Sequence, residues 1–192
     1  MYENLNNLHN YNSCTKVALS LYKVQQSIYL LDFQKVEGDS FSFMKACSRF
    51  ITELKKLSAA VMGLDYGWGP GPALVQMFRE AGFVMDLYDP YFFPDTSFLS
   101  KTYKFITCTE TAEHFYKPFE EFNKINHVLD RGGWLGLMTK FFDKSINFKD
   151  WYYRKDPTHV CFYSEETFHF LASERNWSCE IPSKDIVLFK KN

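Results

Sequence analysis

The segment that decides the fold reads Gly63-Leu64-Asp65-Tyr66-Gly67-Trp68-Gly69-Pro70-Gly71. It closes a short apolar run, residues 59–65, of the kind found in buried parallel strands. A helical pattern opens just after it, at Ala73. Glycines between a strand and a helix allow a tight turn and let backbone amides approach a ligand, while the helix start offers unpaired N–H groups. The segment therefore predicts a nucleotide-type ligand at the carboxyl end of this strand, and a merely tight strand–helix turn is the alternative.

Two carboxylates narrow the choice of ligand. Asp89 ends the next predicted strand, where a carboxylate can accept hydrogen bonds from both hydroxyls of a ribose. Asp65 lies two residues before Gly67, where its negative charge would repel a diphosphate but suit the ammonium group of an amino acid. The glycine spacing, with Pro72 after Gly71, also departs from the GxGxxG of dinucleotide sites and opposes a nicotinamide oxidoreductase. A P-loop is excluded because no Gly-Lys-Ser/Thr follows.

The rest of the chain alternates between strand and helix patterns, which favours an open α/β sheet. We expect helices over 41–57, 73–80 and 118–129, a helix capped by Ser164, and strands over 83–88, 105–109, 134–139, 177–181 and 186–189. The last two strands should form a hairpin. In the helix over 118–129, Phe119, Phe122 and Ile125 should face inward. Only about fifteen residues separate Asp89 from the next strand, too few for a full strand with two crossovers, so one edge strand should be missing or short.

Composition excludes several classes of protein. Of the 192 residues 46% are hydrophobic, enough for one domain with a full core. The formal net charge of -1 gives no reason to expect nucleic acid as a partner. The five cysteines are widely spaced and form no CxxC pair, which predicts reduced thiols in a cytoplasmic protein. The polar N-terminus has neither a leader nor a membrane-spanning pattern, so we expect no membrane association.

Four segments together carry a resemblance to a known family. LDYGWGPGP, LYDP, TCTETAEHF and RGGWLGLMTK resemble the successive motifs of class I S-adenosylmethionine-dependent methyltransferases, over roughly residues 41–181. The bacterial small-domain type related to quinone-biosynthesis methylases is most similar, and WYYRKDPTHVCFYS extends the match. The resemblance implies a three-layer, doubly wound, mostly parallel sheet with an antiparallel C-terminal hairpin. It also implies a methyltransferase domain over 41–192, with residues 1–40 as an N-terminal extension or lid.

The same resemblance implies S-adenosylmethionine as cofactor and S-adenosylhomocysteine as product. Asp65, Gly67 and Gly69 would line the methionine moiety, Asp89 would hold the ribose, and Thr109 and Glu110 would lie beside the donor. Tyr66, Trp68 and Pro90 complete the implied cofactor-binding set. Trp68 replaces a smaller residue, and either covers the cofactor or packs under the helix. Asp95 could contact the adenine, although a wall made by Phe92, Phe93 or Phe98 is favoured.

Two histidines are candidates for catalysis. Methyl transfer from a sulfonium needs alignment of the acceptor and, for some acceptors, removal of a proton. His159 lies in a loop expected at the carboxyl edge of the sheet, where ligands bind, and His114 follows the strand that carries Thr109. Packing roles are the alternative for both. No cluster of ligands at metal spacing is visible, so we expect no metal.

These observations predict an enzyme that methylates a small-molecule acceptor of unknown identity. A catalytically silent S-adenosylmethionine-binding protein, acting as a partner or regulatory module, is the alternative. That alternative is supported by three features: Trp68, the missing edge strand and the unfamiliar N-terminus.

Overall fold

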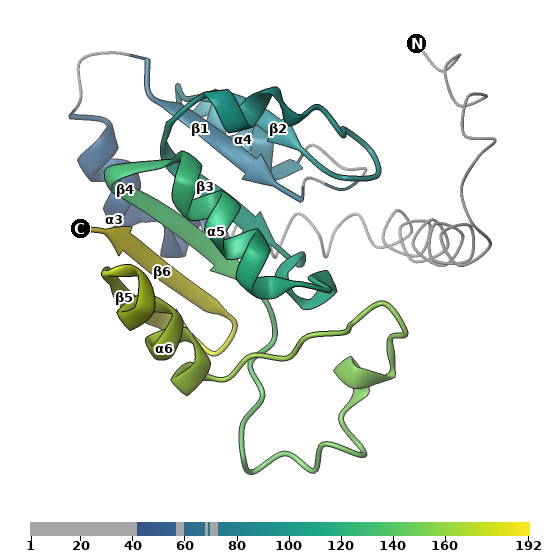
Figure 1. The fold of residues 1–192 in the computed structure, drawn as a ribbon. Helices are drawn as coiled ribbons and strands as arrows, with labels where there is room; N and C mark the ends of the chain where they lie inside the picture. The colour runs from purple at the N-terminus through teal and green to yellow at the C-terminus, as the bar shows by residue number, and fades with distance from the viewer. Residues whose placement is uncertain (1–41, 57–59, 68, 70–72) are drawn as a thin grey trace, which may run out of the picture.

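The computed structural model describes residues 42–56, 60–67, 69 and 73–192, and its centre is a six-stranded sheet in the order β2-β1-β3-β4-β6-β5. The strands are β1 Met62–Tyr66, β2 Val84–Tyr88, β3 Tyr103–Thr109, β4 Leu129–Met138, β5 Trp177–Ser183 and β6 Ile186–Lys191. The first four are parallel, whereas β6 runs antiparallel to both β4 and β5 (Figure 1). The predicted mostly parallel sheet with a C-terminal hairpin is confirmed.

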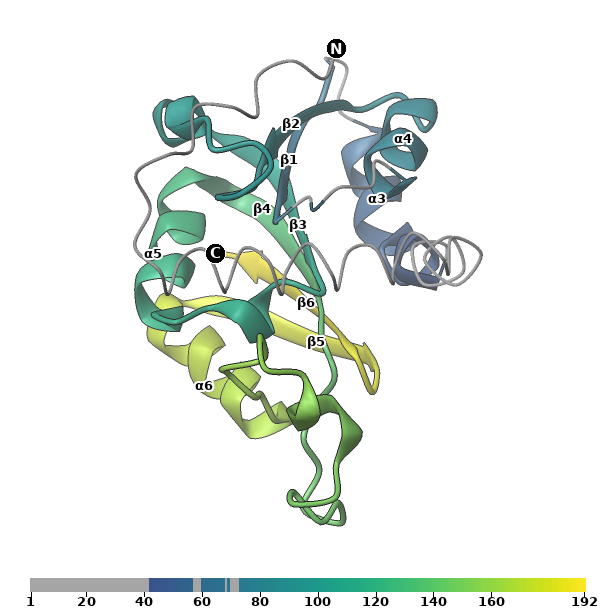
Figure 2. The same ribbon diagram turned by 90° about the vertical axis from the view of Figure 1, so that its right-hand side faces the viewer.

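Helices cover both faces of the sheet, which gives the three predicted layers. The α-helices are α3 Ser48–Leu54, α4 Ala73–Glu80, α5 Pro118–Val128 and α6 Glu165–Arg175, and the 3-10 helices are η2 Thr96–Ser100, η3 Ala112–His114 and η4 Tyr152–Lys155. Figure 2 shows α3 and α4 on one side of the sheet and α5 and α6 on the other. Ser164 caps α6 as expected, because its hydroxyl accepts from the backbone of Thr167.

Two hydrophobic clusters fill the spaces between sheet and helices. Because successive side chains of a strand point to opposite faces, neighbours on β3 belong to different clusters. Phe105 packs with Phe78 of α4, whereas Ile106 belongs to the cluster that contains Phe122 of α5 and Phe168 of α6. All five side chains are fully buried. The sheet is therefore held rigidly, so that the loops at its carboxyl edge project from a fixed base.

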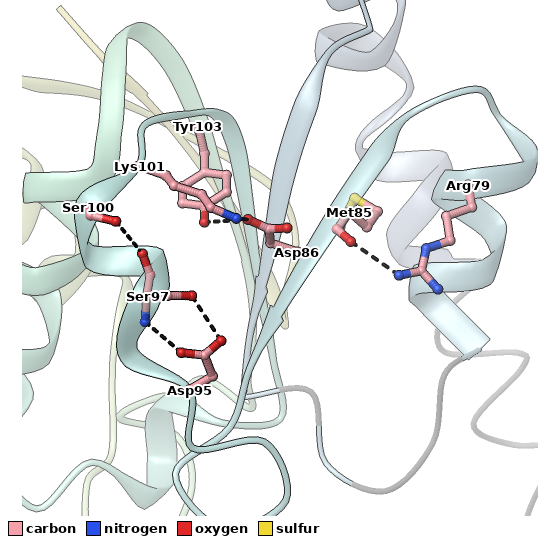
Figure 3. Close-up of polar contacts among 8 residues, drawn as sticks. All are labelled: Arg79, Met85, Asp86, Asp95, Ser97, Ser100, Lys101 and Tyr103. Carbon is pink, nitrogen blue, oxygen red and sulfur yellow. Dashed lines mark hydrogen bonds and ion pairs between the residues drawn. The ribbon is translucent and has the colours of Figure 1, made fainter.

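The edge next to β2 lacks the further strand, as the short spacing predicted. Within residues 90–102 the structure has only η2 and an isolated bridge between Asp89 and Phe93. Asp86 on β2 instead accepts hydrogen bonds from Lys101 Nζ and Tyr103 Oη, at 2.7 and 2.8 Å (Figure 3). Asp95 caps η2 by accepting from the backbone and the hydroxyl of Ser97 (Figure 3). A short polar connection thus replaces a full β-α unit.

Two details differ from the prediction. The helix α5 ends at Val128 and β4 already begins at Leu129, because Leu129 pairs with Tyr103 and a bulge precedes Trp134. Phe119 does not face inward: it is 66% exposed and lies under the Arg175 guanidinium, 5.3 Å from the ring centroid. It belongs to the first turn of α5, where a cation from α6 covers the ring in place of the core.

Two further expectations concern residues 1–40 and membrane-spanning helices. The proposed extension or lid over 1–40 lies outside the described residues. Among the described residues, no helix combines the length and the apolar character that crossing a bilayer requires.

Candidate active site

A cavity of about 220 Å³ opens where β1, β2 and β3 end. Its lining contains six of the predicted residues: Tyr66, Gly67, Asp89, Pro90, Glu110 and His114. Seven residues that the sequence did not single out complete it: Tyr88, Tyr91, Thr111, Phe115, Tyr116, Lys117 and Glu121. The carboxyl edge of a parallel sheet is where open α/β folds bind ligands, because the loops there converge. The predicted residues at the ends of three separate strands therefore meet in one cavity.

Gly67 is fixed by contacts on both sides of the loop. Its N–H donates to the Tyr88 carbonyl at 2.7 Å, and its own carbonyl accepts from Thr111 Oγ1 at 3.1 Å. Its φ of 87° lies in the left-handed region. A Cβ at this position would lie 2.1 Å from Thr111 Cγ2, inside van der Waals contact. Only glycine satisfies both the backbone angle and the space.

Asp89 ties the two loops of the cavity together. Its carboxylate is buried, and Oδ1 accepts from the N–H groups of Tyr91 and Phe92 at 2.8 and 2.9 Å. The other oxygen, Oδ2, accepts from Gly69 N at 3.0 Å. These three backbone N–H groups provide a buried carboxylate with the hydrogen bonds it would otherwise make to water. The residue at the end of β2 therefore orders both the glycine loop and the loop that follows β2.

Asp65 lies deeper than the sequence suggested and does not line the cavity. Its carboxylate accepts from Thr107 Oγ1 at 2.5 Å on the neighbouring strand β3. The pKa of Asp65 is raised to about 6, mainly by burial; the hydrogen bond from Thr107 opposes this shift, and the negative charge of Asp89 adds to it. A cation placed near this pair of carboxylates would restore the ionised form.

The cavity wall includes a link between β1 and α5. Tyr66 Oη donates to Glu121 Oε2, and the other oxygen of Glu121 accepts from Lys124 at 2.7 Å. Burial, followed by the hydrogen bond and the charge of Glu121, raises the pKa of Tyr66, so its proton stays on the phenol. No sequence signal indicated Glu121, because an acidic residue in the first turn of a helix is ordinary.

Glu110 occupies a backbone conformation that is rare outside glycine. Its φ is 48°, and its N–H donates to the carbonyl of Met138 on β4 at 2.8 Å. Strained residues of this kind concentrate at functional sites, where surrounding structure holds them. The strain turns the chain sharply after β3, so that Thr111 and His114 both reach the cavity. Thr109, one residue earlier, does not line it.

The two predicted histidines lie side by side. Their ring centroids are 4.9 Å apart; His114 lines the cavity, while His159 lies behind it with only 5% of its side chain exposed. His114 Nδ1 is 3.0 Å from the Thr158 carbonyl and His159 Nδ1 is 2.7 Å from the Tyr153 carbonyl. A carbonyl oxygen only accepts, so each Nδ1 carries a proton and each neutral ring has its lone pair at Nε2. Burial lowers the pKa of both rings, which keeps them neutral near pH 7.

Glu113 explains how these histidines come together. Its carbonyl accepts from the N–H groups of Val160 and Cys161 at 2.9 and 3.0 Å, which fastens the loop of His159 to η3. Its side chain is 0% exposed, with Oε1 accepting from Tyr153 Oη at 2.6 Å. Burial raises the pKa of this carboxyl, against the hydrogen bond from Tyr153. The sequence analysis did not select Glu113, although a charged residue next to a candidate histidine is a weak signal.

The family model described as "Methyltransferase domain" matches residues 40–180, most of the chain. The chain belongs to this methyltransferase family. The protein is thus a methyltransferase, as the sequence motifs predicted. Trp68 and Pro70 lie outside the described residues, so the role of Trp68 stays a prediction, as does the likeness to quinone-biosynthesis methylases.

Solved structures share the fold at low sequence identity. The 1,6-didemethyltoxoflavin-N1-methyltransferase of Burkholderia thailandensis, solved with its substrate and S-adenosylhomocysteine, is 12% identical with a TM-score of 0.61, over 95% of this chain and 92% of that chain. An Archaeoglobus fulgidus SAM-dependent methyltransferase is 15% identical with a TM-score of 0.59, over 85% and 99%. A Burkholderia thailandensis O-methyltransferase family protein is 11% identical with a TM-score of 0.53, over 88% of this chain.

Two of the matches are partial. The chain spans 62% of the length of that O-methyltransferase family protein. A second family model, described as "Kinase associated domain 1", matches residues 18–55 only, a small part of the chain that overlaps the methyltransferase match and shows no further family.

Proposed function

We propose that this methyltransferase transfers a methyl group from S-adenosylmethionine to a small-molecule acceptor that enters the cavity beside His114. The observation that carries the proposal is the cavity itself, whose lining joins the glycine loop, the carboxylate at the end of β2 and a histidine. A space of about 220 Å³ suits part of a small ligand and excludes a folded macromolecule. S-adenosylhomocysteine is then the product that leaves the site.

The residues at the carboxyl ends of β1 and β2 fit the cofactor. Gly67 lines the cavity and has no side chain, so a ligand can approach its backbone closely. Asp89 would hold the ribose, because a carboxylate oxygen can accept two hydrogen bonds and Oδ2 accepts one from the backbone N–H of Gly69. Asp65 would stabilise the ammonium of the methionine moiety, which in turn would favour its ionised form. Thr109 and Trp68 stay in the proposed cofactor set on the resemblance alone.

S-adenosylmethionine supplies an electrophilic methyl on a sulfonium, a good leaving group, so the protein's task is alignment and proton removal. His114 lines the cavity and would face the acceptor. His159 touches its ring from behind, and its Nε2 lies 3.9 Å from Asp156 Oδ2. The pair would take up the proton of a hydroxyl or protonated amine, since both rings are neutral and hold their lone pairs at Nε2.

Calorimetry with S-adenosylhomocysteine tests the cofactor half of this proposal. One molecule should bind per chain, and absence of binding would overturn the proposal. A panel of hydroxyl- and amine-bearing small molecules, with release of S-adenosylhomocysteine as the readout, tests the acceptor half. Binding of the product with no turnover on any member of a broad panel would favour the silent binding protein instead.

A further inference from the structure

Three potential metal ligands meet next to the cavity. One carboxylate oxygen of Glu113 and one ring nitrogen each of His114 and His159 lie within 4.8 Å of one another. Helix α5 and strand β4 separate His159 from the other two along the chain, which is why the spacing of ligands in the sequence predicted no metal. The backbone bonds from Val160 and Cys161 to the Glu113 carbonyl create the cluster.

A buried oxygen in this cluster has no hydrogen bond. Glu113 Oε2 is shielded from solvent and accepts none, although its partner Oε1 is bonded to Tyr153. A buried acceptor without a partner is energetically costly, so such atoms are rare and point to a missing ligand. The hydroxyl of Tyr153, itself 3.0 Å from Thr139 Oγ1, fixes the carboxylate in this orientation.

The histidines are oriented as metal-binding histidines are. Each uses Nδ1 to donate to a backbone carbonyl, Thr158 for His114 and Tyr153 for His159. This bond fixes the tautomer with the proton on Nδ1 and the lone pair on Nε2, the usual arrangement of a metal-bound imidazole. Asp156, whose Oδ2 is 3.9 Å from His159 Nε2, adds a second negative charge close by.

We infer that Glu113, His114 and His159 form a site for one divalent transition-metal ion, and that zinc matches the donor set best. Two imidazole nitrogens and one carboxylate form a common set of protein ligands at zinc sites that keep an open position. Such ligands lie about 2.0–2.2 Å from zinc and hence about 3.5 Å from each other, so closing the set takes side-chain movements of about an ångström. The bond to zinc would satisfy Glu113 Oε2.

The open position of this ion would face the cavity, because His114 lines it. A metal there acts as a Lewis acid and lowers the pKa of a bound hydroxyl. An Nε2 bound to zinc no longer accepts a proton, so with the metal present a hydroxyl acceptor would bind the ion and release its proton to solvent, and the metal would replace the histidine pair in removing the proton. This statement about the acceptor rests on the proposed methyl transfer, whereas the metal site does not.

Titration with cobalt and zinc tests the site without any cofactor or acceptor. Protein dialysed against a chelator should bind one Co²⁺ per chain, with the visible absorption of a low-symmetry complex, and Zn²⁺ should displace it. Proton NMR of the unsubstituted protein should show the imidazole signals of His114 and His159 shifted by Co²⁺, with those of the exposed His127 and His169 unaffected. Shifts at the exposed histidines alone would overturn the inference.

Substitutions give an independent measure. Glu113→Gln and His159→Ala should each weaken Zn²⁺ binding by more than the 10- to 100-fold typical of losing an outer partner. His127→Ala removes an exposed histidine at the end of α5 and should leave the affinity unchanged. Circular dichroism checks that each variant is folded. Unchanged affinity in a folded Glu113→Gln or His159→Ala protein, or an equal loss in His127→Ala, would contradict the site. Because no S-adenosylmethionine is present, these results do not depend on methyl transfer.

Discussion

The glycine-loop side of the cavity and its histidine side are assembled in different ways. Gly67 and Gly69 follow β1, residues 89–93 follow the adjacent parallel strand β2, and Asp89 joins the two segments by hydrogen bonds to backbone N–H groups. On the other side, Glu113 and His114 meet His159 only because a distant loop is fastened to η3. The first side is built from the ends of neighbouring strands, and the second from segments that lie far apart in the sequence. Substitutions on the two sides should therefore separate cofactor binding from turnover.

The largest effect is expected on the histidine side. His159→Ala should lower turnover of an identified acceptor by about 10²–10⁴, the usual contribution of proton removal, while affinity for S-adenosylhomocysteine stays nearly unchanged. His159→Asn should do the same if the imidazole takes the proton or binds a metal, and should be tolerated if the ring only makes a hydrogen bond. Steady-state kinetics and calorimetry on the same samples measure both. An equal loss of cofactor affinity would show that the two sides are not separable.

On the glycine-loop side, Gly67→Ala should weaken binding of S-adenosylhomocysteine by about 100-fold. Alanine is strained at the left-handed φ of this position, and its Cβ would clash with Thr111. Gly82→Ala is a matched control, because Gly82 also has a positive φ, 93°, but has open space around its missing Cβ. Calorimetry should find the control close to the unsubstituted protein in affinity. If both variants lose the same affinity, backbone strain alone is responsible and the close approach at Gly67 is irrelevant.

Asp89→Ala should weaken the cofactor by about 1.5–3 kcal/mol, the scale of hydrogen bonds to a charged group. The structure adds a second consequence, since three backbone N–H groups lose their acceptor. Thermal unfolding without ligand should therefore also shift downward. Asp95→Ala, which removes only the cap of η2, is the comparison and should leave affinity unchanged. Full cofactor affinity in Asp89→Ala would refute the ribose assignment.

The smallest expected effect is that cofactor affinity and protein stability depend on pH through the ionisation of Asp65. Its folded-state pKa of about 6 lies above the ordinary value of 3.8, so the folded protein favours the neutral acid. Stability from this group is present below pH 3.8 and is lost as the pH rises through about 6. An ammonium ligand needs the ionised form, of which about a tenth exists one pH unit below the pKa. Affinity should thus fall about tenfold from pH 7 to pH 5.

Asp65→Asn provides the control for that dependence. The amide cannot ionise, so both the pH trend in affinity and the one in stability should flatten. Calorimetry and thermal unfolding at pH 5, 6 and 7 measure them. A trend that persists in Asp65→Asn belongs to another group.

The sequence by itself determined the layered sheet, the hairpin and the glycine-loop side of the cavity. These features are local, because patterns of consecutive residues predict a strand, a tight turn and a helix. The carboxyl ends of parallel strands then meet at one edge of the sheet. Even the missing edge strand followed from a count of residues, because a crossover needs a minimum length. The cavity contains Tyr66, Gly67, Asp89, Pro90 and Glu110, which the motifs and the family resemblance implied for the cofactor site, and His114, which was a candidate base.

Only the tertiary structure decided the depth of Asp65, the exposure of Phe119 and the surroundings of His159. Each depends on which segments that are distant in the sequence pack together, and the periodicity of hydrophobic residues along the chain does not indicate this. Thr107 reaches the Asp65 carboxylate because β3 pairs with β1. The loop of His159 is held by hydrogen bonds to the backbone carbonyl of Glu113, a group that every residue has. Backbone hydrogen bonds of this kind leave no signature in residue type, so the cluster of Glu113, His114 and His159 exists only once the chain has folded.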